Sequence, residues 1–219
     1  MAPGKFITFE GGEGSGKSTQ ARLLMQRLAA RGIEVVATRE PGGSPFAEAI
    51  RAVLLAGNLP AHGPLPEALL FCAARADHLE TAIRPALAAG RWVICDRFSD
   101  STRVYQGTAG GLEPSVLDAL EGLVVAPTRP EVTFILDLPA AAGLARASAR
   151  RGAAVAGQAI ADPYERRDLD FHERLRAGYR ALADTEPDRC ILIDGAAALD
   201  TIAADIWAHV ERRLLTGQP

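Results

Sequence analysis

Short apolar runs rich in β-branched residues alternate along this chain with longer segments in which apolar residues recur at helical spacing. The five candidate strands are residues 5–10, 34–39, 91–96, 131–138 and 189–194. Each of the first four is followed by a segment long enough for a helical crossover, which parallel strands require. The pattern predicts an α/β fold with a parallel sheet covered by helices on both faces, where ligands bind at the carboxyl ends of the strands.

Helical periodicity marks the segments between and after these strands. Helices are expected over residues 17–30, 67–89 and 199–215. A length of 219 residues with 48% hydrophobic content suits one sizeable core. We therefore expect residues 1–219 to form a single domain.

A glycine-rich loop follows the first expected strand. Gly11-Gly12-Glu13-Gly14-Ser15-Gly16-Lys17-Ser18 fits the pattern G-x-x-x-x-G-K-[ST] at every fixed position. Glycines let successive backbone N–H groups turn toward a polyphosphate, and the helix that starts near Gly16 adds its partial positive charge. Lys17 would reach the β- and γ-phosphate oxygens, and the Ser18 hydroxyl would ligate Mg²⁺. The segment is therefore a candidate phosphate loop.

An ordinary glycine-rich turn is the alternative, and it is disfavoured because strand, loop and amphipathic helix occur in the order that the motif requires. The chain has only two lysines, Lys5 and Lys17, and its other basic residues are arginines. Lysine at position 17 thus indicates a need for a compact ammonium group that arginine does not supply.

Two arginines flank the loop after the second expected strand. Thr38-Arg39-Glu40-Pro41-Gly42-Gly43 is a turn that leads into a helix containing Arg51. Arg39 and Arg51 either clamp a phosphate group or form surface salt bridges with Glu40 or Glu48.

A charged pair, Asp96 and Arg97, directly follows the third expected strand. Buried charges are costly unless they are used or paired. We favour a functional role, in which Asp96 holds a Mg²⁺-bound water and Arg97 bridges two phosphates, over a mutual salt bridge.

Phe71 and Arg75 are four residues apart in the long expected helix and share one of its faces. A phenylalanine at helical spacing is usually a core residue, but this pair also offers a nucleobase a stacking surface and a donor fork. After the third strand, a helical turn carries hydroxyl and amide groups suited to reading a base or sugar edge. These residues are Ser101, Thr102, Tyr105 and Gln106.

A helix with Arg146, Arg150 and Arg151 follows the fourth strand. After it come a Gly/Ala-rich loop, residues 152–161, and a highly charged segment, residues 162–180. A loop bordered by arginines beside a nucleotide site is typical of a phosphate-transfer lid, which excludes water and brings positive charge on closure. The alternative, a solvated charged helix, describes part of the segment. We place the lid at about residues 147–166.

Composition narrows the class of partner. The net charge of −3 argues against a general nucleic-acid binder. Cys72, Cys95 and Cys190 are odd in number and lie in apolar surroundings, which favours buried reduced thiols over a disulfide or a metal site. The four histidines show no metal-ligand spacing. Since no signal peptide and no membrane-spanning stretch is recognisable, we expect a cytoplasmic protein.

Together these motifs make the chain similar to the bacterial thymidylate kinases, a family of P-loop nucleoside monophosphate kinases, over nearly its whole length. The resemblance rests on residues 9–17, 38–43, 71–75 and 96–98, on Ser101-Thr102 with Tyr105-Gln106-Gly107, and on residues 171–174 with Gly178-Tyr179. It implies a three-layer P-loop NTPase fold with five parallel strands and a short lid, a homodimer, and MgATP-dependent phosphorylation of dTMP to dTDP.

The resemblance also implies roles for individual residues. Phe71 would stack on thymine, Arg75 would donate to a base carbonyl, and Tyr105 would crowd the 2′ position against ribonucleotides. Thr102 and Gln106 would read the base edge.

The resemblance also implies three sets of site residues, which bind ATP, bind dTMP and catalyse the transfer. The expected ATP-binding residues are Gly11, Gly12, Glu13, Gly14, Ser15, Gly16, Lys17, Ser18, Thr19 and Arg146, the last lying along the adenine. The expected dTMP-binding residues are Glu13, Arg39, Arg51, Phe71, Arg75, Arg97, Ser101, Thr102, Tyr105 and Gln106. The expected catalytic residues are Lys17, Asp96, Arg97, Arg150 and Arg151, with Ser18 and Asp96 as Mg²⁺ ligands, partly through water.

The chain departs from the family pattern at two places. The family takes a catalytic arginine from the phosphate loop or from the lid, and Gly14 leaves the lid as its source. Yet Pro163 stands where the lid motif has its arginine, so Arg150, Arg151, Arg166 or Arg167 would have to substitute. Gly110 likewise stands where relatives often have arginine.

Two alternative functions stay open: a kinase for another nucleoside monophosphate or a small hydroxyl acceptor, and a catalytically impaired P-loop nucleotide-binding module. Pro163 motivates the second. A guanine-nucleotide switch is excluded because its Asn-Lys-x-Asp motif is missing, since the only asparagine, Asn58, is followed by Leu59-Pro60.

Overall fold

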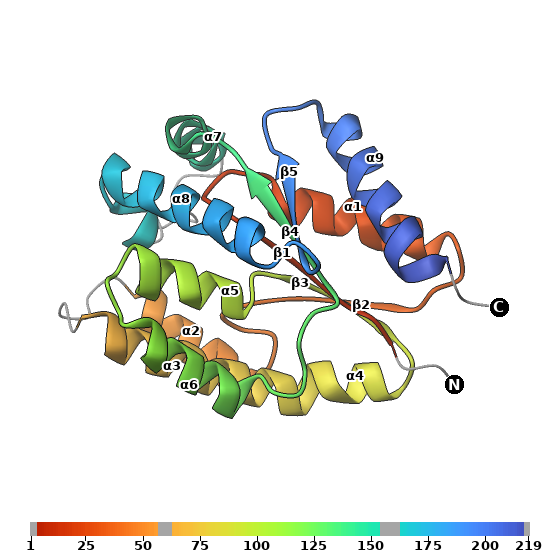
Figure 1. Ribbon diagram of the computed structural model, residues 1–219, viewed down its shortest axis with the longest axis horizontal. Coiled ribbons are helices and arrows are strands. Elements are labelled where there is room, and N and C mark those ends of the chain that lie inside the picture. The colour runs from red at the N-terminus through yellow and green to blue at the C-terminus, as the bar shows by residue number, and fades with distance from the viewer. Residues whose placement is uncertain (1–3, 57–62, 154–162, 217–219) are drawn as a thin grey trace.

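The computed structural model describes residues 4–56, 63–153 and 163–216. Five parallel strands form one sheet in the order β2-β3-β1-β4-β5 (Figure 1). The strands are β1 Phe6–Gly11, β2 Val35–Arg39, β3 Trp92–Asp96, β4 Val132–Asp137 and β5 Cys190–Asp194. No strand boundary differs from the predicted one by more than one residue, so the parallel α/β sheet is confirmed.

Helices cover both faces of the sheet (Figure 1). The α-helices are α1 Lys17–Ala29, α2 Pro45–Leu55, α3 Pro64–His78, α4 Arg84–Ala88, α5 Ser99–Thr102, α6 Pro114–Val124, α7 Ala140–Ala153, α8 Leu169–Thr185 and α9 Leu199–Val210. The π-helical segments Leu79–Ile83, Arg103–Thr108 and Glu211–Leu215 continue α3, α5 and α9, and the 3₁₀ turn Pro163–Arg166 precedes α8. None of the described helices is long and apolar enough to cross a membrane.

One face of the sheet packs against α1 and α9. Ile7 and Phe9 of β1 and Phe134 of β4 form a core there with Leu28 of α1 and Trp207 of α9. Because successive strand residues point to opposite faces, the other residues of β1 face α4, α5 and α8. Both faces of the strand are therefore buried, as the continuous apolar runs of the sequence indicated.

Strand register brings three strand ends to one edge of the sheet. Phe9 of β1 pairs with Asp96 of β3, and Asp96 pairs with Arg39 of β2. The charged residues that follow these strands must therefore lie together, and the candidate site lies at this edge.

Two helical predictions need correction. The segment predicted as one helix over residues 67–89 begins at Pro64 and divides into α3, a π-helical segment and α4. Pro85 lies in the first turn of α4, where the missing N–H of a proline is tolerated. The loop predicted over residues 152–161 is helical at its start, because α7 runs on through alanines and arginines to Ala153. The rest of that loop lies outside the described residues.

Cys72, Cys95 and Cys190 are buried and free, as predicted. Burial raises the pKa of all three thiols and keeps them protonated.

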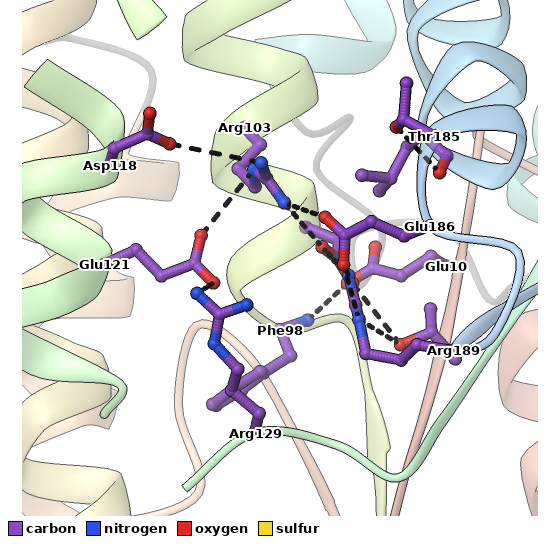
Figure 2. Close-up of polar contacts among 12 residues, drawn as sticks. Glu10, Phe98, Arg103, Asp118, Glu121, Arg129, Thr185, Glu186 and Arg189 are labelled. Atoms are coloured by element: carbon purple, nitrogen blue, oxygen red, sulfur yellow. Dashed lines mark hydrogen bonds and ion pairs between the residues drawn. The ribbon is translucent and has the colours of Figure 1, made fainter. Parts of the chain in front are cut away.

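Ion pairs connect the helical segment after β3 with the start of β5 (Figure 2). The fully buried carboxylate of Asp100 accepts two hydrogen bonds from Arg189, at 2.6 and 2.9 Å. Glu186 pairs with Arg189 at 2.9 Å and with Arg103 at 2.5 Å. Each of these four charged side chains thus has an ion-pair partner from another segment of the chain.

Replacing Arg189 with methionine should lower the free energy of unfolding by about 3–5 kcal/mol, because Asp100 would keep a buried charge without its partner. Urea denaturation measures this change. The control is Arg129→Ala, which removes the exposed Arg129 from its ion pair of 3.1 Å with Glu121 but leaves Glu121 paired with Arg103 at 3.6 Å, and it should cost less than about 1 kcal/mol. If both variants lost the same free energy of unfolding, the claim that Arg189 neutralises the buried charge of Asp100 would be wrong.

Candidate active site

The phosphate loop follows β1 at the carboxyl edge of the sheet. Its glycines adopt positive φ angles that favour glycine: 133° at Gly11, 66° at Gly14 and 100° at Gly16. A Cβ atom on Gly14 would lie 2.1 Å from the carbonyl oxygen of Gly143 in α7, and one on Gly143 would lie 2.2 Å from the carbonyl oxygen of Glu13. The loop and α7 are therefore in backbone-to-backbone contact.

Lys17 is buried and folds back over this loop. Its Nζ atom donates to the carbonyl oxygens of Gly12 at 2.7 Å and Gly11 at 3.1 Å. Burial and the nearby charge of Arg97 lower the pKa of Lys17 to about 8, against the opposing effect of Glu13. The ammonium group lies where phosphate oxygens can replace the carbonyl oxygens as its acceptors.

Ser18 and Asp96, the two predicted magnesium ligands, are in contact, because the Ser18 hydroxyl donates to the Asp96 carboxylate. Oxygen ligands suit Mg²⁺, which retains several waters and takes few protein ligands when it also binds phosphates. Among the residues that the structure describes, no group of three or more His, Cys, Asp and Glu side chains forms a metal site. The pair therefore fits a magnesium ion that arrives with a nucleotide.

Arg97 lies at the centre of the site. Its backbone φ is 70°, the only positive value at a non-glycine residue in the described ranges. Its guanidinium donates to Glu13 at 2.6 Å and to the carbonyl oxygen of Gly11 at 3.1 Å. The alternative of a salt bridge between Asp96 and Arg97 is therefore not observed. Burial alone would raise the pKa of Glu13, but Arg97 and Lys17 lower it to about 2.

The sequence assigned no role to Glu10, which is fully buried near Arg97. Its carboxylate accepts hydrogen bonds from the Phe98 backbone N–H at 2.7 Å, from Ser101 at 2.6 Å and from Tyr179 at 3.0 Å. Figure 2 shows Glu10 beside Phe98, joined by a dashed line. Burial and the negative charge of Asp100 raise the pKa of Glu10 to about 7. The sequence did carry a signal for this role, because a glutamate near the end of an apolar strand indicates a buried charge that needs partners.

Arg75 and Phe71 project from α3 into the same cavity as the phosphate loop. Arg75 is buried, and its Nε atom donates to Glu40 at 2.7 Å while Nη2 donates to the Phe98 carbonyl oxygen at 3.2 Å and to Thr102 at 3.1 Å. Burial alone would lower the pKa of Arg75, but Glu40 outweighs it and raises the pKa. Arg75 therefore stays charged in a dry environment.

Tyr105 and Gln106 lie beside this pair, on the π-helical turn. The Tyr105 hydroxyl donates to Glu13 at 2.8 Å, and Gln106 Nε2 donates to Glu67 at 3.1 Å. Glu67 also accepts a hydrogen bond of 2.9 Å from Tyr164, in the 3₁₀ turn before α8. Tyr164 lines the cavity and is a further site residue to which the sequence assigned no role, whereas Glu67 contacts it without lining the cavity.

Arg39 and Arg51 lie at the outer side of the cavity. Arg39 forms the predicted alternative, an exposed salt bridge of 2.9 Å with Glu48. Arg51 donates to the Pro41 carbonyl oxygen at 2.7 Å. Both side chains also line the cavity, so the salt bridge and a phosphate-binding role are compatible.

A single cavity of about 740 Å³ joins these groups, a volume in the range of small-molecule sites. The predicted site residues that line it are Glu13, Gly14, Gly16, Lys17, Ser18, Thr19, Arg39, Arg51, Phe71, Arg75, Asp96, Arg97, Ser101, Thr102, Tyr105, Gln106, Arg150 and Arg151. Gly11, Gly12, Ser15 and Arg146 are not among the lining residues. The phosphate loop and the Phe71–Arg75 pair thus belong to one site.

Known proteins are similar in sequence to this chain over almost its full length. The thymidylate kinase family profile matches residues 9–206. The chain is 54% identical to the thymidylate kinase of Caulobacter vibrioides over 214 residues, which are 98% of this chain and 99% of that protein. It is 52% identical to the thymidylate kinase of Nitrobacter winogradskyi over 213 residues, 97% of this chain and 90% of that protein.

The chain belongs to the thymidylate kinase family. The crystal structure of thymidylate kinase from Ehrlichia chaffeensis is similar to it with a TM-score of 0.74 and 34% identity, over 95% of this chain and 99% of that one. The predicted family and its P-loop NTPase fold, a five-stranded parallel sheet between helices, are therefore confirmed.

Two candidates for the expected lid arginine lie on α7. Arg150 and Arg151 line the cavity, and Arg151 pairs with Glu165. Arg167 instead lies over the Phe171 ring, with its Cζ atom 5.2 Å from the ring centroid, and neither Arg166 nor Arg167 lines the cavity. Residues 154–162 of the predicted lid lie outside the described residues.

Two further positions were singled out by the family resemblance, Arg146 and Gly110. Arg146 donates to the Gly195 carbonyl oxygen at 3.1 Å. A Cβ atom on Gly110 would lie 2.6 Å from the carbonyl oxygen of Gln106 and 2.8 Å from that of Tyr105. A side chain at position 110 would therefore collide with the backbone at the end of the π-helical turn, which leaves no room for the arginine expected there.

A pH series of wild-type protein and Glu10→Gln tests the environment of Glu10. The pKa of Glu10 rises from 4.5 to about 7 on folding, so at intermediate pH the folded state holds a proton that the unfolded state has released. The free energy of unfolding should therefore fall as the pH rises from 5 to 8, on the order of 2–3 kcal/mol more in the wild-type protein than in the variant. Urea denaturation at each pH measures both slopes, and equal slopes would contradict the burial of this carboxyl.

Proposed function

We propose that this chain transfers the γ-phosphoryl group of ATP to dTMP, giving dTDP and ADP. One observation carries the proposal: a single cavity has a phosphate loop at one end and the Phe71–Arg75 pair at the other, with Arg97 between them. Such a cavity suits two nucleotides whose phosphate groups meet. Membership of the thymidylate kinase family supports dTMP as the acceptor.

The chemistry needs no strong general base. An oxygen of the dTMP phosphate, already anionic near neutral pH, would attack the γ-phosphorus as the bond from that phosphorus to the ADP oxygen breaks. Lys17 and Arg97 would stabilise negative charge on the transferring group and hold the two phosphates in line. Two carboxylates that line this path are already engaged, Glu13 by Arg97 and Asp96 by Ser18, which agrees with catalysis by alignment.

Magnesium would be held by Ser18 directly and by Asp96 through water. When bound, it would offset negative charge on the β- and γ-phosphates of ATP. The contact between the two side chains supports their joint role.

The dTMP end of the cavity has groups for each part of this nucleotide. Phe71 would stack on the base, Arg75 would donate to its carbonyl oxygen, and Arg39 and Arg51 would bind the phosphate with Arg97. The remaining contacts would come from Glu13, Ser101, Thr102, Tyr105 and Gln106. Arg146, on the neighbouring helix, would lie along the adenine of ATP.

We also infer a homodimer and a cytoplasmic location. Exposed apolar side chains on α2 and α3, which pack together, support a covered surface there: Phe46, Val53, Leu65 and Leu69. Three buried free thiols agree with a reducing compartment.

A panel of acceptors assayed with MgATP tests the proposed reaction. Coupled measurement of ADP release should give dTMP a kcat/KM about 100-fold above those of purine monophosphates, because the base pocket must lose polar contacts with the wrong base. Lys17→Ala should lower kcat with dTMP by about 10³-fold. Equal rates for dTMP and a purine monophosphate would favour a broader kinase, and ATP binding without turnover would favour an impaired module.

Two neighbouring arginines allow a test of the lid. Arg150 has no hydrogen-bond or ion-pair partner within the described ranges, whereas Arg151 is held by Glu165. We therefore expect Arg150→Ala to lower kcat by about 100-fold and Arg151→Ala by less than about tenfold. Steady-state kinetics at saturating dTMP and ATP measure both. The reverse order would assign the catalytic charge to Arg151.

A further inference from the structure

A buried chain of polar side chains lies behind Arg75. Glu40 follows β2, and Arg75 and His78 lie three residues apart on one face of α3. The exposed fractions are 5% for Glu40, 3% for Arg75 and 0% for His78. A buried charged chain of this kind is costly unless its geometry is well satisfied.

The two oxygens of Glu40 have different partners. Oε2 accepts from Arg75 Nε at 2.7 Å, and Oε1 lies 3.1 Å from His78 Nδ1. Since a carboxylate only accepts hydrogen bonds, Nδ1 of His78 must carry the hydrogen. His78 Nε2 lies 2.8 Å from the Thr38 hydroxyl. The imidazole is thus held at both nitrogens and fixes the plane of the carboxylate.

The backbone around this chain leaves space for the imidazole. Gly43 has a φ of 87°, and a Cβ atom on it would lie 2.3 Å from His78 Nε2 and 2.5 Å from the Thr38 hydroxyl. The glycine after Pro41-Gly42 therefore lets the strand-end loop approach His78.

Arg75 is restricted by these contacts to one orientation. Nε is bound by Glu40, and Nη2 by the Phe98 carbonyl oxygen and Thr102. Arg75 also interacts with the Cys72 thiol. In the part of the chain that the structure describes, Nη1 makes no hydrogen bond to a protein oxygen or nitrogen atom, and the side chain lines the cavity. One edge of the guanidinium is left to donate to a ligand.

We propose that His78, acting through Glu40, is a positioning residue that aims Arg75 at an acceptor atom of the pyrimidine base. The inference rests on the proposed function, in which Arg75 binds the base. Thymine and uracil carry an acceptor oxygen at C4, whereas cytosine carries a donor amino group there. An Arg75 that is held rigidly discriminates between these bases, and one that can rotate does so less well.

Two conservative variants of His78 separate this role from simple filling of the core. In His78→Asn the side-chain amide nitrogen can replace Nδ1 and donate to Glu40. In His78→Gln the longer side chain reaches toward Thr38 and places its nitrogen at the Nε2 position. Both variants keep a polar amide, so they differ mainly in the contact with Glu40.

The experiment measures kcat and KM for dTMP, dUMP and dCMP with saturating ATP in the wild-type protein and both variants. We expect the dTMP-to-dCMP ratio of kcat/KM to fall about tenfold in His78→Gln, which corresponds to the loss of one charge-assisted hydrogen bond. It should stay within about twofold of the wild-type ratio in His78→Asn. The dTMP-to-dUMP ratio should not change in either variant, because both bases carry the same acceptor oxygen.

Other outcomes overturn the inference in distinguishable ways. A general loss of stability would lower kcat/KM for all three acceptors by the same factor and leave both ratios unchanged. His78 would then be a purely structural residue. Retention of the dTMP-to-dCMP ratio in His78→Gln would have the same meaning. A wild-type protein that does not prefer dTMP to dCMP would instead contradict the proposed function itself, before any variant is considered.

Discussion

Pairing of buried charges at one edge of the sheet is the constraint on which the site depends. Parallel strands end together there, and each brings a charged residue into a region with little water. Glu13 has Arg97 as its partner, and Glu40 has Arg75. Because an unpaired charge would be expensive in this region, each pair also positions the helix or loop that carries its arginine.

This constraint explains how the cavity can bind a negatively charged ligand while its arginines keep the same positions. Four of the arginines that line the cavity are already held by carboxylates, so little reorganisation is needed there when phosphate groups enter: Arg39, Arg75, Arg97 and Arg151. Arg97 illustrates the arrangement, since Glu13 and the Gly11 carbonyl oxygen hold it on one side while it lines the cavity. The acidic residues therefore orient the basic ones, although acidic groups near a phosphate site would seem unfavourable by charge alone.

The sequence was sufficient for the sheet, the phosphate loop and most residues of the cavity, because these depend on local patterns. Apolar runs predict strands, and a complete motif predicts the loop geometry at Gly14 and Lys17. The partners of individual charges were not predictable, because they depend on contacts between distant segments. Arg97 pairs with Glu13 rather than with its neighbour Asp96, and His78 reaches Glu40 from another element. The division of the long helix and the helical end of α7 also depend on packing that a single sequence does not display.

The contact between Gly14 and Gly143 has an evolutionary consequence. Each glycine is blocked by a carbonyl oxygen from the opposite segment, so enlarging one residue does not make room for the other. A change at either position would force the two backbones apart and would disturb the loop before any benefit could arise. In evolution the two positions are therefore linked, because a side chain at position 14 would also require the backbone at Gly143 to move.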